Sequence, residues 1–124
     1  MKRNRFRVAL AGLLVLLSTT FCLVTPRPAL SFLPDKMPDA QVRVPYKVDI
    51  LITGNTTPAG NYSISDGTLP PGLELVMDEQ LHTAWISGTP SQAGTFEFTI
   101  SVWCYGTNVS GQTGDKQYML LVGE

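Results

Sequence analysis

The stretch TFEFTISVWC at residues 95–104 decides the fold class of this chain. Apolar side chains occupy every second position from Phe96 to Cys104, and mostly polar side chains lie between them. A period of two residues is typical of a strand with one buried and one solvated face. The stretch therefore predicts a long, half-buried β-strand, in which Trp103 is the one large apolar residue on the outward face.

The same period recurs along the rest of the body in shorter segments, separated by turn residues such as Asp66-Gly67. No window of the body shows the i, i+3, i+4, i+7 spacing of an amphipathic helix. These patterns predict an all-β, antiparallel sandwich of about seven strands, whose two sheets bury their apolar faces about 10 Å apart. The segments expected as strands are residues 44–53, 61–65, 73–75, 83–87, 95–104 and 116–122.

Charge divides the 124 residues into two unlike parts. Residues 1–31 contain five basic residues and no acidic one, whereas residues 32–124 contain four basic and all ten acidic residues. The body therefore carries a net charge of −6, although the whole chain carries −1. This length and charge exclude a multidomain enzyme, a polytopic membrane protein and a basic nucleic-acid binder, so nucleic acid is not an expected partner.

The first 31 residues have the layout of an export signal. Residues 1–7 carry four positive charges, and residues 8–24 follow without any charge. A positive start and an apolar stretch are typical of a secretory signal, whose charges stay on the cytoplasmic side. We expect residues 1–31 to be a helical signal peptide or an N-terminal membrane anchor. The protein is then exported and is periplasmic, secreted or held at the cell envelope, with membrane contact only through this segment.

The fate of this leader stays open between several alternatives. Ala29-Leu30-Ser31 offers small residues for cleavage before Phe32, and residues 18–20 offer a rival site before Phe21. An uncleaved anchor is the third alternative, because 17 uncharged residues lie at the short limit for a membrane span. The fourth is acylation of Cys22, which the bulky residue before it disfavours. Mass spectrometry of the mature N-terminus distinguishes these cases.

Prolines mark the boundary between leader and domain. Residues 25–45 contain five of them, and proline removes backbone donors and favours an extended chain. Residues 32–40 are therefore expected to form a spacer, and residues 41–124 the folded domain.

The two cysteines do not predict an internal disulfide in the mature body. Cys22 lies in the leader, so Cys104 has no intramolecular partner after cleavage. Cys104 ends the apolar face of residues 95–104 and is expected to be a small buried hydrophobic residue. The alternative is an intermolecular disulfide, which a non-reducing gel detects.

Five short segments occur in a specific order along the body: VPY at 44–46, GTLPPGLEL at 67–75, ISGTP at 86–90, AGTFEFTISV at 93–102 and Y-x-L-x-V at 118–122. In this order they resemble the immunoglobulin-like domain of bacterial surface proteins, which is similar to cadherin-like and dystroglycan-type modules. The resemblance covers about residues 41–123 and implies an immunoglobulin-like sandwich.

The motifs that carry the resemblance are of a structural kind. Pro70-Pro71 stiffens a corner, and Gly72 permits a positive φ that other residues resist. The family usually occurs as tandem repeats inside long surface proteins, whereas here one copy follows a leader. A simple role as a tandem spacer is therefore not expected.

Catalytic residue patterns are absent from the sequence. His82 is the one histidine, and no spacing joins it to Cys104 as a nucleophile and its base. The chain has no H-E-x-x-H, no Cys-x-x-Cys and no phosphate-binding glycine loop before a helix. We expect a protein that is not an enzyme and needs no cofactor.

Calcium is the one cofactor left open, because cadherin-like modules bind it through loop carboxylates. Calcium takes six to eight oxygen ligands, and the acidic residues here are scattered without an EF-hand pattern. The candidate ligands are Asp66, Asp78, Glu79 and Asp115, with Asp35 and Asp39 in the expected spacer.

Exposed apolar residues indicate a binding surface. Trp103, Met119 and Leu121 all lie on outward positions of two strands that are expected to pair, so we expect one apolar patch. Trp85 is expected to be exposed elsewhere, and an exposed Trp suits a partner protein or a sugar ring. The sequence predicts an interaction or adhesion module that binds an envelope or extracellular protein. The alternative is a carbohydrate-binding or calcium-dependent, cadherin-like adhesion module.

Overall fold

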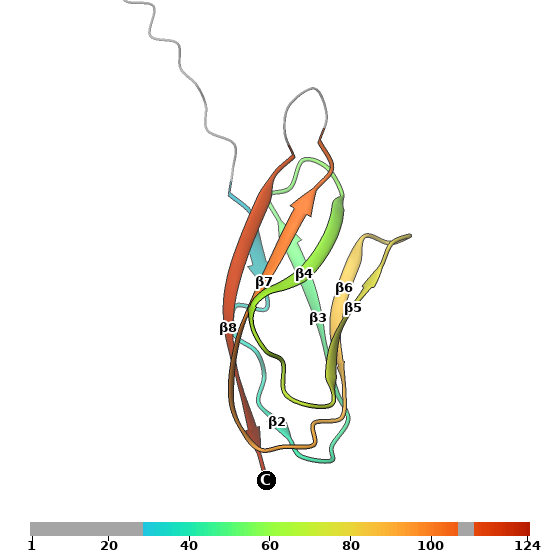
Figure 1. The fold of residues 1–124 in the computed structure, drawn as a ribbon. Helices are drawn as coiled ribbons and strands as arrows, with labels where there is room; N and C mark the ends of the chain where they lie inside the picture. Colours follow the sequence, from blue (N-terminus) through green and yellow to red (C-terminus); the bar gives the residue numbers. More distant parts are fainter. Residues whose placement is uncertain (1–28, 107–110) are drawn as a thin grey trace, which may run out of the picture.

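A computed structural model describes residues 29–106 and 111–124, and in these residues the regular structure is entirely strand. Two four-stranded sheets lie face to face, with strand orders β1-β3-β6-β5 and β2-β8-β7-β4 (Figure 1). The all-β sandwich predicted from the sequence is confirmed; the predicted leader helix lies outside the described residues. The strands are β1 (Ser31–Leu33), β2 (Ala40–Gln41), β3 (Tyr46–Thr53), β4 (Ala59–Gly67), β5 (Leu73–Asp78), β6 (Thr83–Gly88), β7 (Gly94–Cys104) and β8 (Thr113–Gly123).

The core fills the space between the sheets with the alternate residues that the sequence pattern identifies. On β7, every second residue from Phe98 to Cys104 is buried, and Phe96 is half-buried at the margin. Ile50 and Ile86 face them from the opposite sheet, and both are fully buried. Alternation thus places one face of each strand in the core and leaves the other for solvent or partners.

The N-terminal segment joins both sheets. β1 pairs antiparallel with β3, and β2 pairs with the end of β8 as the only parallel pair among the described strands. Residues 32–40, expected to be a spacer, are therefore part of the sandwich, and Phe32, Met37 and Ala40 are buried in its core. The expected start of the domain at residue 41 is correspondingly too late. Prolines at 34 and 38 interrupt the period of two and hide two very short strands from a sequence pattern.

The GTLPPGLEL motif at 67–75 and the ISGTP motif at 86–90 meet at one corner of the sandwich. The Thr89 N–H donates to the Gly72 carbonyl at 3.2 Å, and the Ser91 N–H donates to the Pro71 carbonyl at 2.9 Å. Pro70 and Pro90 are fully buried beneath these bonds. Gly72 has a φ of +96°, which a residue with a Cβ adopts only with strain. The two motifs thus have the structural role expected of them, because hydrogen bonds between them hold this corner together.

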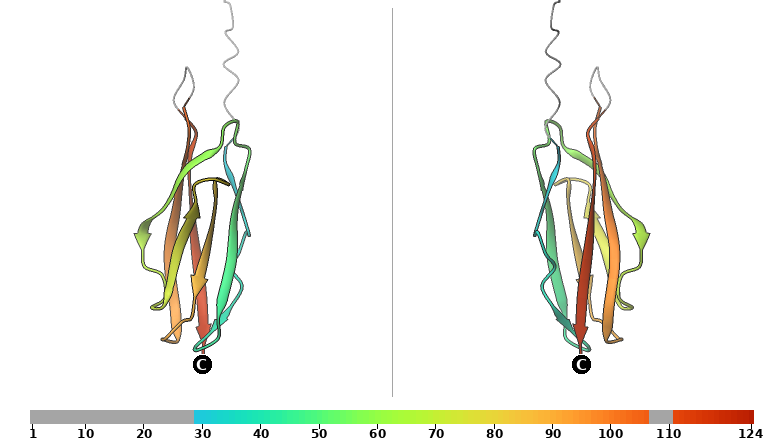
Figure 2. Two further views of the ribbon diagram at one scale, coloured as in Figure 1. Left: turned by 90° about the vertical axis from the view of Figure 1, so that its right-hand side faces the viewer. Right: turned by 90° about the vertical axis from the view of Figure 1, so that its left-hand side faces the viewer.

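The two ends of the sandwich differ in what they carry. Leu30 lies against Gly114 at the start of β8, and the C-terminus lies at the opposite end of the sandwich (Figure 2). β7 and β8 pair in unbroken register from Gly94↔Val122 to Trp103↔Thr113, whereas the pairing of β4 with β7 has two irregularities. Within residues 29–106 and 111–124, no helix is long and apolar enough to cross a membrane.

Candidate functional site

The outward face of β7 and β8 carries three of the predicted binding residues, but not as one patch. Trp103 lies opposite Thr113, near one end of the sandwich, whereas Met119 lies opposite Glu97, near the other. Six residues along a strand span about 20 Å at roughly 3.3 Å per residue. The two intervening cross-strand pairs on this face are polar, so the expected single patch is wrong. These pairs are Ser101↔Asp115 and Thr99↔Gln117.

Met119 and Leu121 form the first of two separate surfaces. They are 59% and 50% exposed and lie two residues apart on β8, so they share one face. Beside them a hollow of about 440 Å³ lies between β8 and the segment 35–39, lined by Asp35, Lys36, Met37, Asp39, Gln117, Tyr118, Met119 and Leu121. We refer to Met119, Leu121 and this hollow as the β8 surface.

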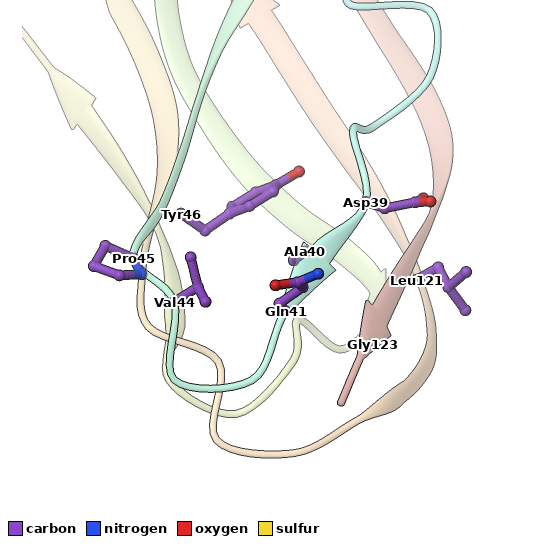
Figure 3. A pocket seen from close by; sticks show the side chains of 8 residues that line it. All are labelled: Asp39, Ala40, Gln41, Val44, Pro45, Tyr46, Leu121 and Gly123. Carbon is purple, nitrogen blue, oxygen red and sulfur yellow. The ribbon is translucent and has the colours of Figure 1, made fainter.

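A second hollow, of about 380 Å³, adjoins the β8 surface at Asp39 and Leu121. In Figure 3 the ring of Tyr46 reaches from β3 toward residues 39–41, while Val44 and Pro45 lie on the far side of the hollow. The Asp39 carboxylate has no hydrogen bond or ion pair within the described part of the chain. A free carboxylate therefore lies between two hollows whose walls combine apolar and polar residues.

Three side-chain bonds hold the segment 34–39 in place. The Tyr118 hydroxyl donates to the Pro34 carbonyl at 2.8 Å, and the Tyr46 hydroxyl donates to the Pro38 carbonyl at 2.8 Å. Burial raises the pKa of both phenols to about 12, so both remain donors near neutral pH. The Lys116 ammonium lies 2.9 Å from the Asp35 carboxylate, and this hydrogen bond lowers the pKa of Asp35. These contacts thus position the segment that lies between the two hollows.

Trp103 belongs to the second surface, at the opposite end of the same sheet. Its indole lies against Gly60 on β4, and its ring meets that of Tyr105 at 84° with centroids 5.4 Å apart. Both residues are nearly half exposed, at 45% and 46%. Tyr105 was not among the sequence-predicted residues, because it follows the last residue of the alternating strand. We refer to Trp103 and Tyr105 as the aromatic corner.

Trp85 lies on the other sheet and joins neither surface. It faces outward from β6 but is only partly exposed, because the Lys47 ammonium lies 5.3 Å from its ring centroid. Leu33 and Leu51 pair across β1 and β3 on that same sheet, and each is 48% exposed. In the strand predicted at residues 44–53, alternation with Ile50 and Ile52 puts Leu51 on the outward face, whereas Leu33 lies on β1, which no sequence pattern marks.

The structure does not bring the candidate calcium ligands together. Asp66 lies on β4, Asp115 on β8, Asp78 at the end of β5, and Glu79 in the turn that follows. The Asp78 carboxylate accepts the N–H groups of Gln80 and Leu81, at 2.8 and 3.0 Å, and so closes that turn. Asp115 accepts a hydrogen bond from the Ser101 hydroxyl. Among the described residues, no three His, Cys, Asp or Glu side chains are placed to hold one metal ion.

His82 and Cys104 both adjoin Ala59, which the sequence spacing did not reveal. The His82 Nδ1 atom lies 3.0 Å from the Ala59 carbonyl, and Cys104 is the cross-strand partner of Ala59. Cys104 is a free, buried thiol whose pKa is raised by burial, the opposite of an activated nucleophile. Burial also removes it from the surface that an intermolecular disulfide requires. Cys22 lies outside the described residues.

Comparison with known proteins agrees with this fold. The family model described as "Putative Ig domain" matches residues 28–123. The chain belongs to this family. The match confirms the resemblance drawn from the five sequence segments and begins before β1, in agreement with a domain that includes residues 32–40. A search of curated protein sequences found no match.

The comparison with solved structures found an adhesin and a titin domain. A mutant of the SrpA adhesin from Streptococcus sanguinis superposes with a TM-score of 0.55 at 13% identity, over 79% of this chain and 57% of the adhesin chain. A titin domain has a TM-score of 0.47 at 17% identity, over 77% of this chain and 97% of that domain. The chain thus spans little more than half of the adhesin, and at this identity the likeness concerns the fold alone.

Proposed function

We propose that this protein is an exported, non-catalytic immunoglobulin-like module that binds another protein at the cell envelope through its β8 surface. The observation that carries the proposal is the exposure of Met119 and Leu121 on a rigid strand beside two hollows. The backbone of a paired strand is already ordered, so binding costs little backbone entropy, and the two apolar side chains bury apolar area against a partner.

The charge around this surface defines the partner's chemistry. Asp39 lies free between the hollows, and Glu97 is the cross-strand neighbour of Met119. Interfaces commonly have an apolar centre and a polar rim with complementary charge. The partner surface is therefore apolar at its centre, with Lys or Arg side chains opposite Asp39 and Glu97 and an acidic or neutral group opposite Lys36, which lines the same hollow as Asp39.

Export is supported by the leader and by the charge of the body. The positive start and the uncharged run of residues 8–24 have the layout of a signal segment, and the body carries a net charge of −6. Leu30 lies beside the start of β8, at the end opposite to the C-terminus, so a retained leader would tether that end (Figure 2). The β8 surface lies near the other end and would project away from the membrane.

The non-catalytic role is supported by the state of the reactive side chains. The His82 Nδ1 atom is within hydrogen-bond distance of the Ala59 carbonyl, and the Cys104 thiol is buried with a raised pKa. Family membership and the adhesin among the solved structures agree with a role in binding.

Photocrosslinking of the full chain in its own cells tests the proposal. A photoreactive residue introduced at position 121 should give a discrete adduct with one envelope protein, and M119D in the same chain should abolish that adduct. Position 51 on the other sheet is the matched control, because Leu51 and Leu121 are equally exposed on opposite faces. Adducts that are the same from positions 51 and 121, or an adduct that survives M119D, would contradict the proposal.

A further inference from the structure

We propose that the aromatic corner of Trp103 and Tyr105 binds neutral saccharides. This site lies about 20 Å from the β8 surface along the same two strands, so it is independent of the proposed protein partner. Three features of the corner favour such a ligand: the orientation of the two rings, the polar side chains beside them and the local charge.

The Trp103 ring presents one face to the strand below it and the other to solvent. Three consecutive atoms of its six-membered ring, Cε3, Cζ3 and Cη2, all lie within 2.8 Å of the position that a Cβ of Gly60 would occupy. Such similar distances to three ring atoms require the ring to lie face down on Gly60. Because the residue is still 45% exposed, the opposite face is available to a ligand.

Tyr105 stands at nearly a right angle to this ring and makes a wall beside it. The interplanar angle is 84°, and the centroids lie 5.4 Å apart. The Tyr105 backbone is fixed on both sides, because its N–H donates to Pro58 at 3.1 Å and its carbonyl accepts from the Thr57 hydroxyl at 2.7 Å. His82 packs against Tyr105 in a second edge-to-face contact at 5.9 Å. The corner is therefore built before a ligand arrives, which lowers the entropy cost of binding.

Hydrogen-bonding side chains lie on both of the strands that flank Trp103. Asn61 on β4 and Thr113 on β8 are its cross-strand partners, and both are exposed on the same face of the sheet. Neither side chain has a hydrogen bond within the described residues, so the amide and the hydroxyl are available to a ligand. Between them they offer both donors and acceptors.

A saccharide matches this arrangement better than a purely apolar ligand does. One face of a sugar ring presents C–H groups, whose weakly positive hydrogen atoms suit the negative face of an aromatic ring. The hydroxyl groups around the sugar ring can form hydrogen bonds with Asn61 and Thr113. No Lys or Arg lies on the three strands within two residues of Trp103, Asn61 or Thr113 along the chain, and the body carries a net charge of −6. An anionic sugar would meet repulsion without a counter-ion, so the ligand is neutral.

The two tryptophans of the chain allow a direct test with the full-length protein. W85F leaves Trp103 as the sole indole, and W103F leaves Trp85 as the matched control on the opposite sheet. The probes are neutral oligosaccharides built from glucose, xylose, mannose or N-acetylglucosamine. At least one should shift or quench the emission of Trp103 in a saturable manner, and the same sugar should leave the emission of Trp85 in W103F unchanged.

Variants of the neighbours test the geometry. N61A, T113A and Y105A should each weaken binding of that sugar, by about tenfold for the loss of an aromatic wall. T95A, on the same face of β7 but beside Leu121, should leave it unchanged, as should L121D. The proposal is overturned if no probe perturbs Trp103, if Trp85 responds equally, or if Y105A and N61A bind as the parent does. None of these results bears on crosslinking at position 121, so the two proposals fail separately.

Discussion

The indole of Trp103 lies face down on Gly60, at an irregularity in the pairing of β4 with β7. Glycine at this position leaves a bare backbone surface, and the aromatic ring covers it. The contact explains why a large apolar residue occupies an outward position in an otherwise polar row. The contact also positions the indole. One face of the ring packs on Gly60, and the opposite face is the proposed binding face.

The first prediction concerns this contact. G60A places a methyl group where the Trp103 ring now lies, and the ring must swing away because it is the mobile end of its side chain. In the W85F background the emission of Trp103 should shift to the red as the ring enters water. The free energy of unfolding should change by only about 1 kcal/mol, because no backbone has to move. An emission maximum equal to that of W85F alone would contradict the contact.

The second prediction uses a glycine whose neighbour is backbone. A Cβ at Gly72 would overlap the Thr89 carbonyl oxygen, and the φ of +96° adds strain for any L-residue. G72A should therefore lower the free energy of unfolding by about 2 kcal/mol or more. Urea unfolding of G60A and G72A, measured side by side, checks the contrast. Equal stabilities would show that the backbone at Thr89 moves as easily as the Trp103 side chain does.

The fold could be read from the sequence wherever alternation was long enough to count. The ten residues from 95 to 104 define a strand and its buried face, and the structure keeps Phe98, Ile100, Val102 and Cys104 in the core as predicted. β1 and β2 escaped because they have three and two residues and lie among prolines. Their residues enter the core through tertiary packing, which no local pattern reports.

The candidate site was half predictable. Alternation gave the correct side for Trp103, Met119 and Leu121, but distance along the strands depends on register. The sequence did contain a signal for their separation. In a hairpin of these two strands, Trp103 lies beside the connecting loop, whereas Met119 lies far from it. The pairing of Trp103 with Tyr105, and the free Asp39 between two hollows, arise from loop and segment placement that the sequence alone did not define.

The third prediction tests the place of β1 in the domain with two adjacent residues. Phe32 faces the core and is buried, whereas Leu33 faces solvent beside Leu51. F32A should lower the free energy of unfolding by about 3–5 kcal/mol, the usual cost of removing a buried Phe. L33A should cost about 0.5 kcal/mol or less. If residues 32–40 were only a spacer, thermal or urea unfolding would give both variants the stability of the parent.

The fourth prediction concerns alkaline pH and the segment 34–39. Tyr118 has a pKa of about 12 in the folded protein and 10.0 as its ordinary value, because it is buried and lies near Asp35. Below pH 10 the phenol is protonated in both states, and its stabilising contribution is complete. Between pH 10 and pH 12 only the unfolded chain loses the proton, so the free energy of unfolding falls by about 1.4 kcal/mol per pH unit for this group.

Y118F separates this effect from general alkaline denaturation. At pH 7 the variant should lose about 1 kcal/mol, because the hydrogen bond to the Pro34 carbonyl at 2.8 Å is gone. Above pH 10 its stability should fall less steeply than that of the parent, since one ionisable group no longer favours the unfolded chain. Urea titrations at intervals from pH 8 to pH 12 measure both slopes, and tyrosinate absorbance follows the ionisation directly. Parallel slopes for the two proteins would mean that Tyr118 ionises as readily in the folded state as in the unfolded one.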